Sequence, residues 1–495
     1  MRQFLLGYDV GSSSVKVTLL DADNGNVIGS GISPKKEMDI DSPHLGWAEQ
    51  NPAGWWHHLK LATGELRQKN DFRPDEILAI GISYQMHGLV LVDRNKNILR
   101  PSIIWCDSRA VDIGEKAFRK MGEEKVLSHL LNSPGNFTAS KLKWVKENEP
   151  EIYDKIDKFM LPGDYIAMKM TGLIRTTVSG LSEGIFWDYR LNGISDMVLN
   201  EYGLDVSMVP ETVPTFGEQG RLTASAASEL ELAEGIPVTY RAGDQPNNAF
   251  SLKAVEPGEI AATAGTSGVI YAVTDKANYD LKSRVNTFVH VNHSPGIPRY
   301  GVLLCVNGTG ILNSWLKNQL GHLDYPEMNQ LASAIPIGSE GVRILPFGNG
   351  AERVLENKDP GAVISGLNFN RHHRGHLFRA AQEGIVFALR YGFDIMNRME
   401  VPLKIVRAGV ANMFLSDVFR EAFVNTTRAT LELYNTDGAQ GAARAAGIGV
   451  KFYKDHEEAF SGLTIRMVIE PDREKMEKYQ NEYNQWLKVL TDKLS

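Results

Sequence analysis

The stretch that decides the fold begins at residue 4 and reads Phe4-Leu5-Leu6-Gly7-Tyr8-Asp9-Val10-Gly11-Ser12-Ser13-Ser14-Val15-Lys16-Val17-Thr18-Leu19-Leu20. Residues 4–9 and 15–20 are apolar or alternating and predict two β-strands, and the polar segment 11–14 predicts the turn between them. An Asn-Gly pair at 24–25 marks a second hairpin turn. We therefore expect antiparallel strands at the start of the chain, with Asp9 just before the first turn.

The first turn recurs half a chain later. Gly265-Thr266-Ser267-Gly268-Val269 resembles Gly11-Ser12-Ser13-Ser14-Val15, and both copies follow a strand and precede an apolar one. A single short match is weak because such turns are common, but the shared strand context strengthens it. The repeat therefore predicts two related halves. Asp9 corresponds to Thr263, so only the first copy carries a carboxylate.

Strand and helix signals alternate along the rest of the chain, which is typical of an α/β protein. Segments 77–83 and 236–242 predict buried strands, and segments 142–147 and 165–170 predict helices. Segment 472–494 predicts an amphipathic helix that docks on the body of the protein. Its apolar residues recur at helical spacing and are expected to be core contacts: Met476, Tyr479, Tyr483, Trp486, Leu487 and Leu490.

The composition excludes several classes of protein. Of 495 residues, 43% are hydrophobic and 23% are charged, which excludes a mostly disordered chain. The net charge is −7 with no long basic run, so we expect neither a nucleic-acid nor a membrane partner. The two cysteines, Cys106 and Cys305, stand alone and cannot form a zinc or redox motif. No export signal or membrane span is evident, so we expect a cytoplasmic protein.

The two turns have the composition of phosphate-binding loops. Glycine lets backbone N–H groups approach an anion, and Ser and Thr hydroxyls add donors. Asp9 beside the first turn is suited to hold Mg²⁺ through water. Plain hairpin turns share this composition, so that alternative stays open. Neither turn is a P-loop, because the sequence lacks G-x-x-x-x-G-K-[ST].

Several segments together resemble the FGGY family of carbohydrate kinases, and among them the xylulose kinases. The resemblance covers nearly the whole chain and rests on the order and spacing of its motifs. These are residues 7–16, Trp47-Ala48-Glu49-Gln50-Asn51-Pro52 with Trp55-Trp56, Gln85-Met86-His87-Gly88, Trp105-Cys106-Asp107-Ser108-Arg109, residues 137–145 and residues 361–383.

The resemblance implies two actin-like, ribonuclease-H-like domains with a cleft between them. Residues 1–243 would form an N-terminal sugar-binding domain, and residues 244–495 a C-terminal nucleotide-binding domain that includes the terminal helix. ATP and Mg²⁺ are the implied cofactors, with Asp9 at the metal. The implied nucleotide-binding residues are Gly11, Ser12, Ser13, Gly265, Thr266, Ser267, Gly308, Gly409 and Asn412. Val410 is bulkier than the glycine that the family usually has in this adenine loop.

Asp244 is the candidate general base, because phosphoryl transfer needs a group that accepts the hydroxyl proton. It follows a strand, where α/β proteins present ligand groups. An Asp before Gln245-Pro246 is also suited to cap a helix, and both roles can coexist. The resemblance implies substrate contacts from Met86, His87, Asp244 and Gln245, although xylulose kinases commonly have Asn where this chain has Gln245.

Two further motifs have alternative interpretations. Asp107 and Arg109 either line the sugar cleft or form a buried structural ion pair. Segment 437–442 is rich in small residues, which suits either close approach to adenine or tight helix packing.

We therefore expect an ATP- and Mg²⁺-dependent ketose kinase that makes D-xylulose 5-phosphate from D-xylulose. The nearest alternative is another FGGY kinase, for ribulose, fuculose or a similar sugar. An actin-like ATPase module that acts on a protein partner is disfavoured by Gln85-Met86-His87-Gly88. A catalytically inactive sugar-binding regulator is disfavoured because Asp9 and Asp244 are both present. The sequence leaves open whether the chain forms a homodimer.

Overall fold

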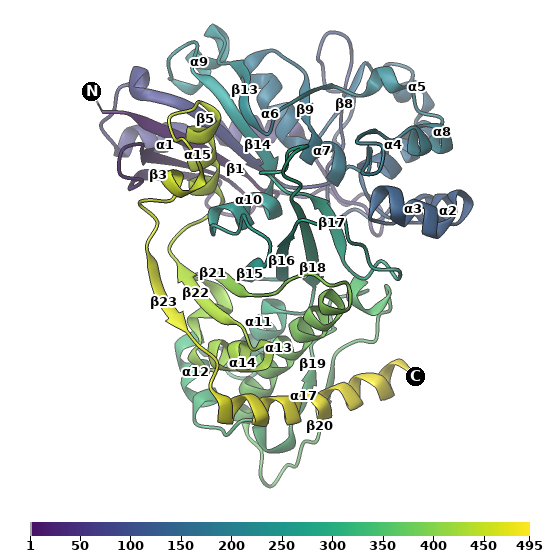
Figure 1. Ribbon diagram of the computed structural model, residues 1–495, viewed down its shortest axis with the longest axis vertical. Coiled ribbons are helices and arrows are strands. Elements are labelled where there is room, and N and C mark those ends of the chain that lie inside the picture. The colour runs from purple at the N-terminus through teal and green to yellow at the C-terminus, as the bar shows by residue number, and fades with distance from the viewer. Residues whose placement is uncertain (1) are drawn as a thin grey trace. The chain divides into compact units, whose positions relative to one another are not determined.

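The computed structural model describes residues 2–495, which form two compact units (Figure 1). Unit 1 comprises residues 2–253, Phe288–Arg299 and Thr436–Leu463. Unit 2 comprises Ala254–Thr287, Tyr300–Asn435 and Thr464–Ser495. Each unit is made of three separate segments of the chain, so the units do not correspond to a single cut in the sequence. The domain boundary expected between residues 243 and 244 stays a prediction.

Unit 1 is built on a six-stranded mixed sheet. Its order is β13-β14-β5-β1-β2-β3. Strands β1 and β2, β2 and β3, and β13 and β14 pair antiparallel, whereas β5 runs parallel to both β1 and β14. The strands are β1 (Phe4–Val10), β2 (Val15–Asp21), β3 (Val27–Ser33), β5 (Ile77–Tyr84), β13 (Phe216–Arg221) and β14 (Pro237–Gly243).

A second sheet has seven strands in the order β17-β18-β16-β15-β21-β22-β23, and all of it except the second half of β17 belongs to unit 2. Here β21 runs parallel to β15 and β22, whereas β15 and β16, β16 and β18, and β22 and β23 pair antiparallel. The strands are β15 (Glu259–Ala264), β16 (Gly268–Thr274), β17 (Asn286–Val289), β18 (Tyr300–Val306), β21 (Ile405–Gly409), β22 (Thr430–Tyr434) and β23 (Ile465–Ile469).

The two sheets share one topology. Each strand of the unit 1 sheet has a counterpart in the second sheet, and each pair of neighbours in the unit 1 sheet is parallel or antiparallel as its counterparts are. The counterparts of β1, β2, β3, β5, β14 and β13 are, in that order, β15, β16, β18, β21, β22 and β23. The two glycine-rich turns occupy equivalent places, between β1 and β2 and between β15 and β16. The internal repeat and the α/β fold class expected from the sequence are therefore confirmed.

Helix α15 (Gly438–Gly449) packs against β1 and β5, although it follows them by hundreds of residues (Figure 1). The helix can pack this closely because both strands have a glycine where it touches them. A Cβ atom on Gly7 would lie 1.9 Å from the Ala439 carbonyl oxygen, and one on Gly81 would lie 2.0 Å from that of Ala442. Of the two interpretations of segment 437–442, tight helix packing is the one that the structure shows.

We expect Gly81→Ala to destabilise the protein, because the added methyl group must push α15 off the sheet. Overpacking of this kind costs about 1–3 kcal/mol. Gly64→Ala is the matched control: Gly64 lies inside α1 (Pro52–Lys69), and a Cβ atom there meets nothing within 4 Å. That variant should gain up to about 1 kcal/mol from helix propensity. Urea unfolding midpoints measure both, and equal midpoints for the two variants would contradict the packing argument.

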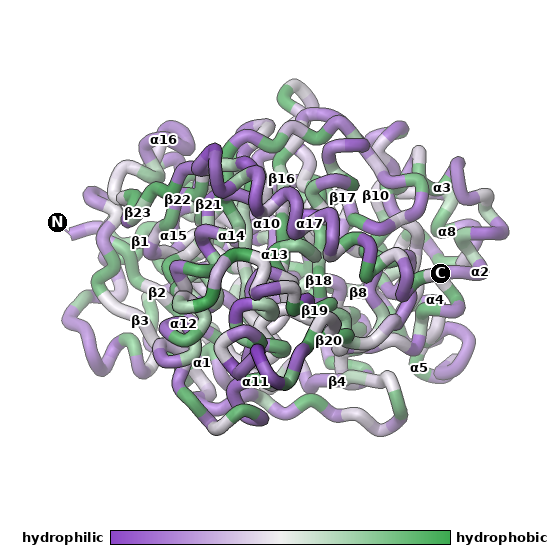
Figure 2. The backbone as a smooth tube through the Cα atoms, turned by 90° about the horizontal axis from the view of Figure 1, so that it is seen from below, coloured by the Kyte–Doolittle hydropathy of each residue, from purple (hydrophilic) through white to green (hydrophobic). Residues whose placement is uncertain are grey.

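The C-terminal helix α17 (Arg473–Leu494) docks on unit 2 as expected. It is mostly hydrophilic with hydrophobic residues at intervals (Figure 2). Tyr479, Tyr483, Trp486 and Leu490 are buried, and the Trp486 indole N–H donates to the Ile344 carbonyl at 2.8 Å. The aromatic residues are thus core contacts.

Across residues 2–495, no helix combines the length and the apolar character that a membrane span needs.

Candidate active site

The first turn and two carboxylates surround a small pocket of unit 1 with a volume of about 300 Å³. We call this the carboxylate pocket. Asp9 comes from the end of β1 and Asp244 from the residue after β14, so the parallel strands β1, β5 and β14 present both side chains at one edge of the sheet. Its lining includes Asp9, Gly11, Ser12, Ser13, Lys16 and Asp244.

Asp9 is held in place on several sides. The Ser83 hydroxyl donates to its Oδ1 at 2.9 Å. Gly438 at the start of α15 lies so close that a Cβ atom there would be 2.5 Å from Asp9 Oδ2. Burial raises the pKa of Asp9, and the neighbouring Asp437 raises it further, while Lys16 opposes this. Lys16 forms an ion pair with Asp437.

Asp244 begins helix α10 (Asp244–Ser251), whose N-cap is Gly243. The sequence allowed Asp244 to be the N-cap, but the N-cap lies one residue earlier and Asp244 is the first residue of the helix. Burial raises the pKa of Asp244 to about 7, with a second contribution from Asp9. A carboxylate with a pKa near neutral is suited to accept a proton at physiological pH.

The carboxylate pocket fits a divalent cation. Two carboxylates raise each other's proton affinity when they share a desolvated pocket, and a cation would offset that repulsion. Carboxylate and water oxygens are the ligands that Mg²⁺ prefers. Asp9 is the carboxylate beside the first glycine-rich turn, and Thr263, its counterpart in β15, offers no such charge.

The first turn is braced by its neighbours. Gly11 N–H donates to the Ser14 carbonyl at 3.0 Å, so this amide is used within the turn. The Gln50 side chain donates to the Ser12 carbonyl at 2.7 Å, and the Trp105 indole donates to the Ser12 hydroxyl at 3.3 Å. Residues from two separate motifs therefore fix the loop that lines the pocket.

Met86 packs against Gly243, the residue before Asp244, and neither Met86 nor His87 lines the carboxylate pocket. Met86 is buried, and a Cβ atom on Gly243 would lie 2.6 Å from its Cγ. His87 adopts a left-handed backbone with φ of 61°, and its ring lies 4.7 Å from that of Phe137 and 5.5 Å from that of Phe288. Gln245 follows Asp244 in α10 and hydrogen-bonds to it.

Sequence reasoning assigned no role to two buried charged residues that hold this region. Lys141 donates from Nζ to the His87 and Ile104 carbonyls, both at 2.9 Å, and burial lowers its pKa to about 7. The backbone carbonyl of Glu183 accepts a hydrogen bond from Nδ1–H of His87 at 2.9 Å. Burial raises the pKa of the Glu183 carboxyl well above its ordinary value. Lys141 lies within residues 137–145, one of the segments that resemble the family, whereas nothing in the sequence around Glu183 indicates a role for it.

Asp107 and Arg109 form a buried ion pair. Their side chains are 0% and 1% exposed, and Arg109 Nη2 lies 2.7 Å from Asp107 Oδ2. Glu49 joins the pair through Arg109 Nη1 at 2.7 Å, and the Arg109 guanidinium stacks 3.8 Å from the Trp47 ring centre. The structural alternative is thus the one observed for these two residues.

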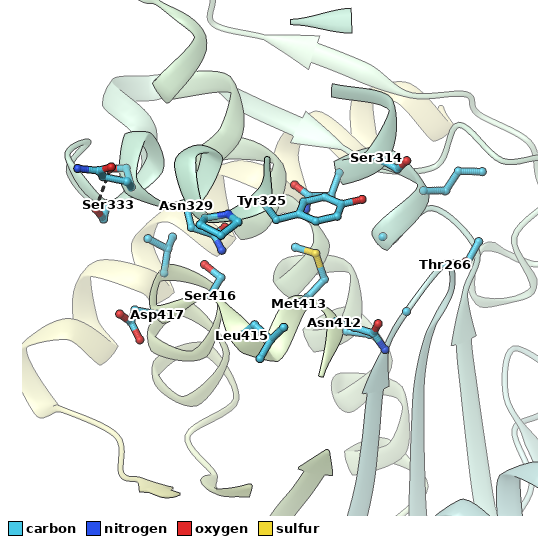
Figure 3. Close-up of a pocket in the computed structure, with 18 residues that line it drawn as sticks. Thr266, Ser314, Tyr325, Asn329, Ser333, Asn412, Met413, Leu415, Ser416 and Asp417 are labelled. Atoms are coloured by element: carbon cyan, nitrogen blue, oxygen red, sulfur yellow. Dashed lines mark hydrogen bonds between the residues drawn. The ribbon is translucent and has the colours of Figure 1, made fainter. Parts of the chain in front are cut away.

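A second, larger pocket of about 860 Å³ lies in unit 2, where the turn after β15 meets helices α11 (Gly310–Gln319) and α12 (Tyr325–Ser333) (Figure 3). Gly265, Thr266 and Asn412 line it. The Gly265 and Thr266 carbonyls accept from the first amides of α11, Gly310 N–H at 2.9 Å and Ile311 N–H at 3.2 Å. This pocket is large enough for a nucleotide.

Three of the nine expected nucleotide-binding residues line neither pocket: Ser267, Gly308 and Gly409. Gly308 N–H donates to the buried Glu352 carboxylate at 3.2 Å, so that amide already has a partner. A Cβ atom on Gly308 would also lie 1.6 Å from the Pro346 carbonyl oxygen, which explains the glycine by close packing. Their roles at a nucleotide stay predictions.

Among residues 2–495, one other group could ligate a metal: Glu340, His372 and His376 in unit 2. Backbone N–H groups of Asn368 and His373 donate to Nδ1 of His372 and His376, at 2.9 and 3.2 Å. In a neutral imidazole, Nε2 then carries the proton and offers no lone pair to a metal. These histidines therefore serve the start of α13 (Arg374–Arg398) rather than a metal ion.

Comparison with known proteins agrees with this geometry. The N-terminal domain of the FGGY family of carbohydrate kinases matches residues 4–251. The xylulose kinase of Escherichia coli K12 is 29% identical over 483 residues, covering 96% of each chain, and that of Bacillus subtilis 168 is 28% identical over 499 residues, covering 99% of this chain and 97% of its own. The crystal structure of xylulose kinase from Rhodospirillum rubrum has a TM-score of 0.88 at 25% identity, over 99% of both chains.

The duplicated sheet, with a glycine-rich turn in each half, is that of the actin-like ATPase fold, and the relatives that span the whole chain make the protein a sugar kinase, a phosphotransferase. The match over half of the chain places the protein more specifically: it belongs to the FGGY family of carbohydrate kinases. The family resemblance and the enzyme class expected from the sequence are both confirmed.

Proposed function

We propose that the protein transfers the γ-phosphoryl group of ATP to D-xylulose, giving D-xylulose 5-phosphate. Curated relatives named xylulose kinase that align with almost the whole chain support the choice of sugar. The observation that carries the chemistry is Asp244, a half-buried carboxylate with a pKa near 7 in the carboxylate pocket. A cytoplasmic location stays a prediction from the sequence.

In this proposal each group has a defined task. Asp244 accepts the proton of the attacking sugar hydroxyl, so that the oxygen can bond to phosphorus as the bond to the leaving ADP oxygen breaks. The hydroxyls of Ser12 and Ser13 donate to phosphate oxygens from the first turn, and Thr266 does so from the second. Met86, His87 and Gln245 contact the sugar beside Asp244.

Asp9 is the residue that would hold Mg²⁺, through water ligands. When bound, the metal neutralises charge on the phosphates during transfer. Ser83 keeps the Asp9 carboxylate oriented through its hydroxyl, and α15 closes the space behind it. Lys16 supplies a fixed positive charge in the same pocket.

A coupled assay of ADP release over pentuloses, hexuloses and polyols tests the proposal. We expect D-xylulose to give the highest kcat/KM, with a pentulose 5-phosphate as product. If ribulose or fuculose gives a higher value, the protein is a kinase of that other sugar. ADP release without any phosphosugar would instead favour an actin-like ATPase module.

We expect His87→Ala to weaken sugar binding without affecting ATP. Loss of a hydrogen bond that leaves its partner unpaired costs about 1–3 kcal/mol, so the KM for the sugar should rise by ~5- to 150-fold. The KM for ATP at saturating sugar should barely change. His57→Ala on the exposed face of α1 is the control and should leave both constants at wild-type values. An equal rise in both constants for His87→Ala would make His87 a structural residue.

A further inference from the structure

A chain of three polar side chains backs the large pocket of unit 2. Ser416 caps α14 (Asp417–Thr427) by accepting from Phe419 N–H at 3.4 Å, and it donates its hydroxyl hydrogen to Gln382 Oε1 at 2.6 Å. Gln382 Nε2 then donates to Asn329 Oδ1 at 3.0 Å. Ser416 and Gln382 are 2% and 0% exposed, so the bond between them is shielded from water, whereas Asn329 is only half-buried.

The direction of this chain fixes the amide of Asn329. Because Oδ1 accepts from Gln382, the group that Asn329 has left for a ligand is its NH₂. Asn329 lines the pocket, whereas Gln382 stands behind it and does not. The pocket therefore presents a hydrogen-bond donor whose orientation is set from the buried side.

The rest of the pocket suits a flat aromatic ring. Tyr325, Met413 and Leu415 give it apolar walls, and Thr266 and Asn329 lie toward opposite ends (Figure 3). A nucleotide with its phosphates at Thr266 would bring the edge of the base that is remote from the ribose toward Asn329. Asn313 also lines the pocket, is 5% exposed, and its Oδ1 has no hydrogen-bond partner among residues 2–495.

We propose that Asn329, oriented by Gln382 and Ser416, determines the choice of nucleobase by donating to N1 of adenine. This inference rests on the proposed function, in which the pocket binds ATP. Adenine offers an unprotonated nitrogen at N1, whereas guanine carries an N–H there. A guanine in the same pose would set two donors against each other and leave both unpaired, which is how a polar site rejects a wrong ligand.

Calorimetric binding of ADP, 1-deaza-ADP and 7-deaza-ADP to the full chain tests this without requiring turnover. The wild type should bind ADP and 7-deaza-ADP alike and 1-deaza-ADP ~10-fold more weakly, the loss of one hydrogen bond that leaves a donor unpaired. Asn329→Leu should bind all three with the same, weaker affinity. A merely structural role for Asn329 would lower every affinity but keep the preference for N1.

Gln382→Leu tests the orienting role, because Gln382 does not line the pocket. With its oxygen no longer held, the Asn329 amide can turn, so the preference for ADP over 1-deaza-ADP should shrink toward unity. Gln319→Leu at the exposed end of α11 is the control and should keep the wild-type preference. Two results would overturn the inference and leave the proposed function standing. One is a wild type that binds ADP and 1-deaza-ADP equally well, and the other is an Asn329→Leu variant that keeps the wild-type preference for ADP over 1-deaza-ADP. A wild-type chain that binds no ADP overturns the proposed function with it.

Discussion

Asp244→Asn should lower kcat by ~10²- to 10⁴-fold, the usual contribution of a general base. Asn is nearly isosteric with Asp but cannot accept the hydroxyl proton at neutral pH. The substitution also removes an acid from the first turn of α10, which costs a few tenths of a kcal/mol through the helix dipole. Sugar binding, measured calorimetrically, should change little by comparison.

Asp112→Asn is the matched control, because Asp112 is an exposed acid in the first turn of α2 (Val111–Met121). It loses the same helix-dipole interaction far from the carboxylate pocket, and its kcat should equal that of the wild type. Turnover of folded Asp244→Asn within a few-fold of wild type would remove Asp244 from the role of base.

The pH profile gives a second measurement of the same group. Burial, and then the charge of Asp9, raise the pKa of Asp244 to about 7. Because the base acts only when it is deprotonated, kcat/KM for the sugar should rise with pH up to about 7 and then level off. Asp244→Asn should lose this limb of the profile, and a profile that keeps it would assign the titration to another group.

The sequence predicts the fold well because the fold repeats. A strand, a glycine-rich turn and a second strand are local features, and the same pattern at residues 265–269 indicated that the second half repeats the first. The order of strands in the sheets could not be predicted from such local signals. The strand order depends on long-range contacts such as that of α15 with β1. The small side chains of segment 438–447 permit close packing, but they do not indicate which strand the helix packs against.

The site could be predicted only where residues form motifs. Asp9 stands at the end of one recognisable strand and Asp244 follows another, and the structure places both in the carboxylate pocket. Glu183 gave no sequence signal, because its importance comes from burial beside His87 and Asp244. Gln382 lies within a stretch that was recognised as a motif, but its hydrogen bond to Asn329 joins two helices and cannot be inferred from spacing along the chain.

Asp9→Asn should raise the Mg²⁺ concentration that half-saturates turnover and should lower the maximal rate, even when MgATP is abundant. Asn keeps an oxygen that can accept from Ser83, so the change removes the charge rather than the hydrogen bond. Thr266→Ala is the matched comparison in the second turn, where the counterpart of Asp9 is Thr263 and carries no charge. It should weaken nucleotide binding and leave the Mg²⁺ requirement unchanged.

The charge of Asp9 also makes a prediction about Asp244. Since Asp9 raises the pKa of Asp244, removing its charge should move the rising limb of the pH profile to lower pH. A structural defect at Asp9 would reduce the rate at every pH and every Mg²⁺ concentration without moving either midpoint. Mg²⁺ curves of Asp9→Asn and wild type that coincide would take Asp9 out of the metal site, and the asymmetry between the two turns would then follow from the fold alone.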